Sequence, residues 1–93
     1  MKKELGIVIA SFRKARKFKQ DYIAVKLGIS TQAYANIERG RSDLSSEKLI
    51  AVASVFGLKT HQLIVLAEEI MDAGETEWLD DAVRSLIRIA APK

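Results

Sequence analysis

The sequence from residue 20 to residue 39 is QDYIAVKLGISTQAYANIER, and it predicts two short helices joined by a tight turn. The first helix fits Gln20–Leu27, where apolar residues recur at the spacing of a buried helical side. It stops at Gly28, because glycine readily adopts the left-handed conformation that ends a helix. Ser30 is a suitable N-cap for the second helix, Thr31–Arg39, so the turn between the two helices is short.

The helix at residues 31–39 has one apolar side and one polar side. Tyr34 and Ile37 are expected to point into the protein. The opposite side is polar and nearly uncharged, and it consists of Thr31, Gln32, Ala35, Asn36 and Arg39. Two helices of this length around a glycine-containing turn are the minimal helix-turn-helix, a motif that places its second helix in the major groove of DNA.

Helical spacing of apolar residues continues on both sides of this stretch. One helix is expected before it, from about Lys3 to Lys17. Three are expected after it, starting at the N-cap Ser45, at Thr60 and at about Thr76, and ending near Phe56, Ala73 and Ala90. No segment alternates like a strand, and the only proline is Pro92. The sequence therefore predicts an all-α protein, with residues 1–73 forming a five-helix domain and residues 74–93 adding a C-terminal helix.

Composition and charge narrow the class of function. The chain has 93 residues, no cysteine and a net charge of +3. Residues 1–41 contain ten basic and three acidic residues, whereas the remainder contains five basic and nine acidic ones. A basic N-terminal half suggests a surface for a polyanion, although solvated lysines on a surface helix explain the same charge. The lack of cysteine excludes thiolate chemistry, and because no apolar run reaches about 18 residues we expect a cytoplasmic protein without a membrane partner.

Residues 20–39 also resemble, position by position, the helix-turn-helix of the phage-repressor family (the Cro or XRE type). The shared positions are Ile23, Ala24, Leu27, Gly28, Ile29, Tyr34 and Ile37. The resemblance extends from about Leu5 to Leu66 and includes the family's Glu-x-Gly at residues 38–40. It departs at Lys19, where the family often has Ser or Thr, and in the loop after Gly40, which lacks the family's common proline. The resemblance implies a five-helix repressor-like domain that regulates transcription.

The resemblance assigns base reading to one side of the second helix. The family reads bases from four positions there, which are Thr31, Gln32, Ala35 and Asn36 in this sequence. The amide of Gln or Asn can pair with both N6 and N7 of adenine, and a small side chain can approach a thymine methyl group. Solvated polar residues would look the same in sequence, but an uncharged surface with amides, flanked by arginines, suits groove reading better.

Phosphate contacts are expected on both sides of this helix. Gln20 resembles the family's glutamine at the start of a helix, where a side-chain amide and backbone N–H groups hold a phosphate. Residues that follow the reading helix are also more often phosphate contacts than base contacts. The expected phosphate-binding residues are Lys17, Lys19, Gln20, Ser30, Arg39, Arg41 and Ser42.

Other polar residues are expected to be structural. Arg13 and Glu38 resemble the family's ion pair that joins the first helix to the reading helix. His61 is the only histidine and has no neighbouring ligand type, while Asp80 and Asp81 point in different directions on a helix. Metal and catalytic sites need convergent partners, so we expect no metal, no catalytic residue and no cofactor.

Residues 74–93 lie largely outside the resemblance. Apolar side chains recur there at helical spacing and form a stripe of Trp78, Leu79, Val83, Leu86 and Ile87. The stripe could fold back on the protein's own core. We favour a homodimer interface, because small DNA-binding domains usually pair to match half-sites one helical turn apart.

The leading hypothesis for function is a sequence-specific regulator that binds double-stranded operator DNA as a homodimer. The alternative is an antitoxin-type protein, whose acidic C-terminal helices would bind a toxin protein and which would autoregulate its operon. An enzyme is the least favoured class, since one histidine, no cysteine and no glycine-rich phosphate loop leave little catalytic machinery.

Overall fold

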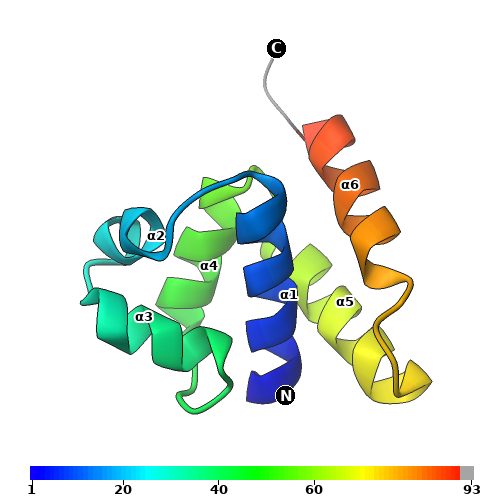
Figure 1. The fold of residues 1–93 in the computed structure, drawn as a ribbon, viewed down its shortest axis with the longest axis horizontal. Coiled ribbons are helices and arrows are strands. Elements are labelled where there is room, and N and C mark those ends of the chain that lie inside the picture. The colour runs from blue at the N-terminus through cyan, green and yellow to red at the C-terminus, as the bar shows by residue number, and fades with distance from the viewer. Residues whose placement is uncertain (91–93) are drawn as a thin grey trace.

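A computed structural model describes residues 1–90, which form six α-helices and no strand (Figure 1). The helices are α1 (Lys2–Ala15), α2 (Gln20–Leu27), α3 (Thr31–Glu38), α4 (Ser46–Val55), α5 (Thr60–Ala73) and α6 (Leu79–Ala90). The all-α prediction is therefore confirmed. The last three residues of the predicted C-terminal segment, 91–93, lie outside the described residues.

The turn between α2 and α3 has the local structure that the sequence predicts. Gly28 adopts a φ of 71°, and its N–H donates to the carbonyl of Val25 at 3.1 Å. The hydroxyl of Ser30 accepts the N–H of Ala33 at 3.0 Å, so it caps the first turn of α3. α3 ends at Glu38, with Arg39 as its C-cap, one residue earlier than predicted.

Two helix ends differ from the sequence prediction by more than one residue. α1 ends at Ala15 rather than Lys17, because Lys17 adopts a φ of 60° and the chain turns back toward α2. α6 begins at Leu79 rather than Thr76. The preceding residues form a turn in which the N–H of Leu79 donates to the carbonyl of Thr76 at 3.0 Å. The indole N–H of Trp78 donates to the carbonyl of Glu75 at 2.9 Å in the same turn.

The core is built around α1, which contacts α3, α5 and α6. Phe12 of α1 stacks on Phe56, the C-cap of α4, with 5.5 Å between ring centroids, and both side chains are fully buried. Phe18, in the loop after α1, extends this stack at 6.4 Å from Phe56. Burying a side chain of this size contributes about 1.5–3 kcal/mol to folding. The aromatic stack therefore fixes the segment that leads into α2 against the rest of the domain.

α6 lies against α1, on a different side from α3 (Figure 1). Leu79 and Val83 are only 2% and 1% exposed and belong to the same core as α1 and α5. The prediction that these two residues form a dimer interface is therefore wrong. Trp78, Leu86 and Ile87 are partly buried against the same core. Helical spacing identifies the apolar side of α6, but α1 already provides the surface that covers it.

Within residues 1–90, no single helix is long and apolar enough to span a membrane. α4 and α5 pass that test only when they are taken together, and they are bent by 100° at the break between them. Both helices contribute buried residues to the core, among them Val52 of α4 and Leu63 of α5.

Candidate nucleic-acid interface

α3 presents most, but not all, of the side chains expected to read bases. Thr31 and Gln32 are exposed, and Asn36 is half-buried. Ala35 is only 7% exposed, so its expected position on the outer side of the helix is wrong. The reason is that α3 packs on both α1 and α2. Together these helices cover more of the surface of α3 than the side that carries Tyr34 and Ile37. The accessible part of the expected reading surface therefore consists of Thr31, Gln32 and Asn36.

Asn36 makes one side-chain contact that reading a base would replace. The Nη1 of Arg39 donates to the Oδ1 of Asn36 at 3.5 Å, and this contact is exposed. A hydrogen bond at this distance is weak, and Arg39 can move into solvent when it breaks. The amide of Asn36 is thus available at low cost for a bidentate pair with a base.

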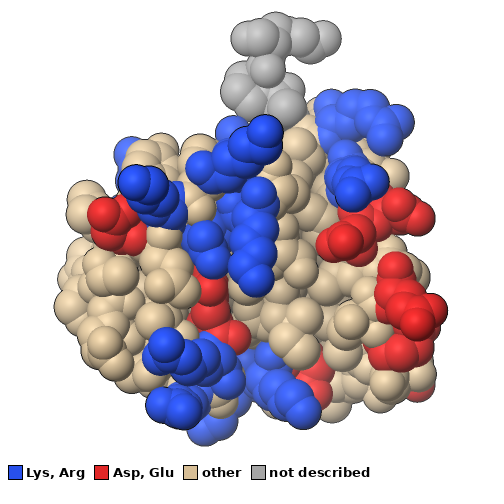
Figure 2. Space-filling view, viewed as in Figure 1, with Lys and Arg blue, Asp and Glu red and all other residues tan. Residues whose placement is uncertain are grey.

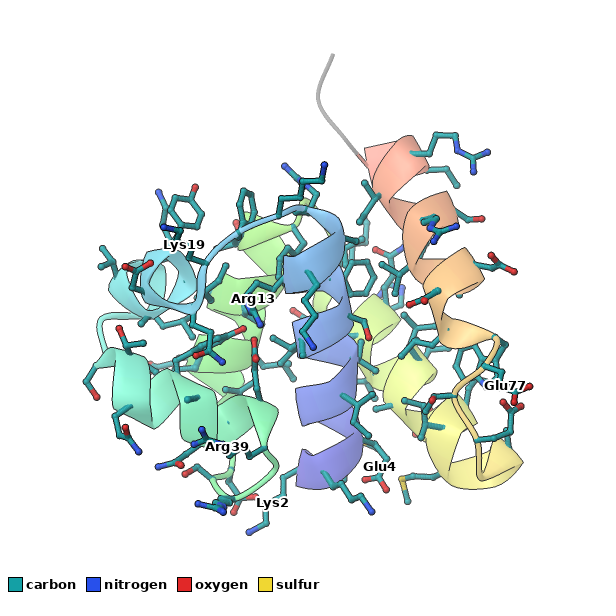
Figure 3. The ribbon with its side chains drawn as sticks, in the orientation of Figure 1. Lys2, Glu4, Arg13, Lys19, Arg39 and Glu77 are labelled. Atoms are coloured by element: carbon teal, nitrogen blue, oxygen red, sulfur yellow. The ribbon has the colours of Figure 1, made fainter. Side chains whose placement is uncertain are left out.

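Six of the seven residues expected to hold phosphates lie in two clusters, and the seventh, Ser30, is the N-cap of α3. The α2-start cluster consists of Lys17, Lys19 and Gln20, and the α3-end cluster consists of Arg39, Arg41 and Ser42. Figure 2 shows basic side chains gathered in upper and lower groups on one side of the molecule. Lys19 and Arg39 belong to the upper and lower groups respectively (Figure 3). The four basic side chains of the two clusters, Lys17, Lys19, Arg39 and Arg41, are all exposed, and Ser42 is half-buried.

Arg13 and Glu38 form an ion pair that connects α1 to the end of α3 (Figure 3). The Nε of Arg13 donates to the Oε2 of Glu38 at 2.6 Å, and its Nη2 donates to Oε1 at 3.2 Å. The side chains are only 13% and 8% exposed, and Arg13 also donates to the carbonyl of Phe18 at 2.9 Å. This bidentate pairing has the geometry that makes a charge-assisted hydrogen bond strong.

The same cluster shifts the pKa of its members. Burial alone would raise the pKa of Glu38, but hydrogen bonds from Arg13 and neighbouring side chains outweigh it and lower that pKa below its ordinary value. The hydrogen bond to Glu38 raises the pKa of Arg13, against an opposing effect of burial. Burial, followed by the Glu38 carboxylate, raises the pKa of the fully buried Tyr34. The cluster therefore holds one carboxylate and one guanidinium, both charged, beside a neutral phenol.

Gln20, in the first turn of α2, connects the ion pair to the surface. Its Nε2 donates to the Oε1 of Glu38 at 2.9 Å, a contact that the sequence did not predict. A side-chain amide nitrogen carries two N–H groups, so one remains for another acceptor. The hydrogen bond to Glu38 thus orients the amide of Gln20 at the N-terminus of α2.

Gly6 allows a close approach between α1 and α3 that helical spacing does not predict. A β-carbon at residue 6 would lie 2.6 Å from the carbonyl oxygens of both Ile37 and Glu38. The only sequence signal is an isolated glycine inside an amphipathic helix, where glycine costs about 1 kcal/mol relative to alanine. Gly6 therefore sets the distance between α1 and the end of α3.

Residues 9–63 match the protein-family model described as helix-turn-helix, which covers the Arg13–Glu38 pair and all of α2, α3 and α4. The chain belongs to the XRE family of helix-turn-helix proteins. This confirms the family suggested by the sequence. The protein is a DNA-binding transcriptional regulator of the helix-turn-helix type.

Solved structures share the fold of this helix-turn-helix protein. A crystal structure of the clp gene regulator ClgR from Corynebacterium glutamicum is 26% identical, with a TM-score of 0.73, and the match covers 95% of this chain and 87% of that one. A second ClgR structure from C. glutamicum is 27% identical, with a TM-score of 0.70, covering 75% and 91% of the two chains. No curated protein matches the sequence significantly.

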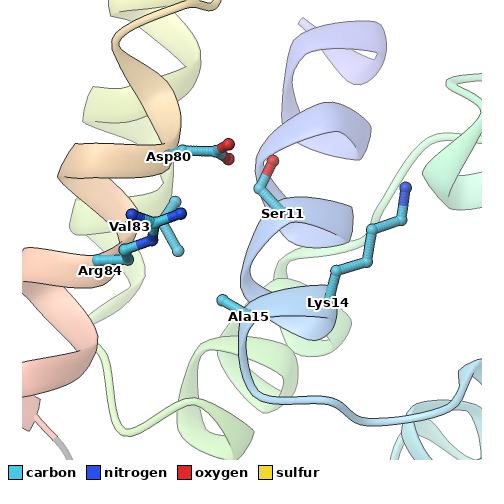
Figure 4. A pocket seen from close by; sticks show the side chains of 6 residues that line it. All are labelled: Ser11, Lys14, Ala15, Asp80, Val83 and Arg84. Carbon is cyan, nitrogen blue, oxygen red and sulfur yellow. The ribbon is translucent and has the colours of Figure 1, made fainter.

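A groove of about 340 Å³ lies between α1 and α6 of the helix-turn-helix protein (Figure 4). Its walls are formed by Ser11, Lys14, Ala15, Asp80, Val83 and Arg84. The side chain of Lys14 points away from Arg84 and Asp80, so the polar groups do not converge on one point (Figure 4). Among residues 1–90, no group of three or more potential ligand residues could hold a metal ion.

Proposed function

We propose that the protein reads operator half-sites by inserting α3 into the major groove of double-stranded DNA. The observation that carries this proposal is the accessible polar surface of Thr31, Gln32 and Asn36 on α3, the helix that lies between the α2-start cluster and the α3-end cluster along the chain. Amides on such a surface can pair with adenine, while Thr31 can bond to either kind of base pair. Ala35 is left out of the proposed set because its side chain is buried.

Phosphate contacts would hold α3 in place from both sides. The α2-start cluster would contact one strand and the α3-end cluster the other, since the major groove is flanked by the two backbones. Gln20 would donate its second N–H to a phosphate at the N-terminus of α2, where the helix dipole also favours an anion. Ser30 uses its oxygen as an acceptor in the α3 cap, so its hydroxyl proton remains available for a phosphate.

The proposed role is regulatory rather than catalytic. Support comes from the clp gene regulator ClgR, whose fold is shared over 95% of this chain. We further propose that two copies of the protein act together, because DNA-binding domains of this size commonly occupy paired half-sites. The two copies would not contact each other through Leu79 and Val83 of α6, since these side chains are already buried in the core of their own copy.

Selection from random duplex DNA, followed by binding at several salt concentrations, tests this function. With four basic side chains on phosphates, the logarithm of the affinity should fall with a slope of about −4 against the logarithm of salt concentration. A four-fold rise in salt should then weaken binding roughly 250-fold. If two copies bind together, the selected sites should be inverted repeats with centres about 10 base pairs apart. A flat salt response, or no enriched sequence, would contradict the proposal.

The residues that read bases should differ from those that bind phosphates in their effect on specificity. Gln32→Ala or Asn36→Ala should weaken binding to the selected site by about 1–3 kcal/mol, with little change on scrambled DNA. Lys19→Ala or Arg41→Ala should weaken binding to both duplexes alike, because phosphates carry no sequence information. The measurement compares the two duplexes at one salt concentration. An unchanged ratio for both amide variants would show that α3 does not read bases through these residues.

A further inference from the structure

The first turn of α1 is packed against the end of α3 and the loop that follows it. A β-carbon at Gly40, whose φ is 75°, would lie 2.7 Å from the α-carbon of Lys3. One turn further along α1, Gly6 meets the carbonyls of Ile37 and Glu38. These backbone contacts fix the start of α1 beside the α3-end cluster, independently of where its flexible side chains point.

This placement brings two further cations to the α3-end cluster. Lys2 and Lys3 are exposed, as are Arg39 and Arg41 on either side of Gly40. In Figure 3 the labelled Lys2 and Arg39 lie at the same edge of the molecule, and Figure 2 shows basic side chains massed there. The backbone N–H of Arg41 donates to the carbonyl of Asn36 at 2.9 Å, so this edge adjoins the reading surface.

Acidic groups of α5 and the turn after it lie near the start of α1. Glu75 lines a surface hollow with Lys3 and Glu4, and Glu68, Glu69 and Asp72 line another with Met1. Glu4 lies 3.8 Å from the N-terminal amine, so it offsets that amine rather than a lysine.

Fewer acidic groups adjoin Arg39 and Arg41. Glu38 is paired with Arg13 and is only 8% exposed. Asp43 is the one exposed carboxylate in the loop from residue 40 to residue 45. Four exposed basic side chains lie at this edge: Lys2, Lys3, Arg39 and Arg41. The side of the edge beside Arg39 and Arg41 therefore keeps a net positive charge, which favours a polyanion.

The start of α1 and the α2-start cluster are separated by a distance that suits a DNA duplex. α1 has 14 residues, and with a rise of about 1.5 Å per residue it places Lys2 about 20 Å from the residues that follow its last turn. Those following residues include Lys17 of the α2-start cluster. The major groove is about 12 Å wide between its backbones, so cations at both ends of α1 can lie over the two flanking strands.

We propose that Lys2 and Lys3 bind DNA phosphates together with Arg39 and Arg41, extending the protein's contact along the strand beside the end of α3. This inference rests on the proposed binding of duplex DNA. The start of α1 then acts as part of the nucleic-acid interface, and it would add two phosphate contacts without adding sequence specificity.

The test compares Lys2→Gln/Lys3→Gln with Arg84→Gln/Arg88→Gln, a control that removes the same charge from exposed residues of α6. For the lysine variant, the salt slope should fall by about two units relative to the wild type. Affinity should drop roughly 200-fold at 50 mM salt and roughly 20-fold at 200 mM, equally for selected and scrambled DNA. The control should stay within roughly three-fold of the wild type, because long-range charge effects are screened.

Phosphate ethylation of the selected duplex gives a second readout. Phosphates beside the α3-end cluster should interfere with binding of the wild type, and those nearest the start of α1 should stop interfering in the lysine variant. If the wild type binds with a steep salt slope but the lysine variant behaves like the α6 control, this inference is wrong and the proposed function stands. If the wild type itself shows no salt-dependent binding to duplex DNA, the proposed function fails first.

Discussion

Replacing Glu38 by alanine should lower the free energy of unfolding by about 3 kcal/mol, or more. The substitution leaves the guanidinium of Arg13 largely buried without its partner, and it also removes the acceptor of Gln20. An unpaired buried charge costs more than the pair itself contributes. Urea unfolding of wild type and variant, followed by circular dichroism, measures the difference. The double variant Arg13→Met/Glu38→Leu should recover much of the loss, because it removes both charges at once.

The same carboxylate should make stability depend on pH in acid. The pKa of Glu38 is lowered on folding, so its contribution is fully present above its unfolded pKa, about 4.3, and is lost as pH falls through the lower folded value. Unfolding experiments from pH 6 to pH 2.5 should therefore show a smaller loss for Glu38→Gln than for the wild type. Equal losses in the two proteins would mean that Glu38 does not contribute through its charge.

Gly6→Val should also destabilise the protein strongly, by roughly 3 kcal/mol, and should weaken DNA binding as well. The new β-carbon would meet two backbone carbonyls at the end of α3, and backbone moves less easily than a side chain. α1 and α3 would have to separate, which would displace the α3-end cluster from its proposed place beside the major groove.

The variant Gly6→Ala tests whether the close contact between residue 6 and the end of α3 is rigid. At an open helical position this change would stabilise the protein by about 1 kcal/mol, because alanine is a better helix former than glycine. At residue 6 we expect the opposite sign, since even one β-carbon lies 2.6 Å from carbonyl oxygens. Thermal unfolding of both variants gives the answer. A more stable Gly6→Ala protein would show that the close approach is not rigid.

Local signals account for the parts of the fold that the sequence predicted well. Gly28 and Ser30 determine their own turn and cap, and the helices on either side of them are right to within one residue. The end of α1 was missed because nothing in a lysine marks the positive φ of Lys17. The start of α6 was missed because a turn held by the Trp78 indole resembles the first turn of a helix.

The candidate site depended on tertiary contacts in ways that spacing cannot supply. Helical spacing put Ala35 on the polar side of its helix, but two neighbouring helices together cover that position. It also found the apolar stripe of α6 without revealing that α1 covers Leu79 and Val83. The hydrogen bond from Gln20 to Glu38 joins residues 18 positions apart, and only the packed domain brings them together.

α1 separates the reading helix from α6, with one packed on each side of it. Substitutions on the outer sides of α3 and α6 should therefore be energetically independent, because changes in the free energy of unfolding usually add when the two sites share no contacts. Coupling between them would have to pass through a displacement of α1, whose position is fixed at Gly6 and at the Arg13–Glu38 pair. The outer side of α6 can accordingly diverge in sequence while recognition by α3 stays the same.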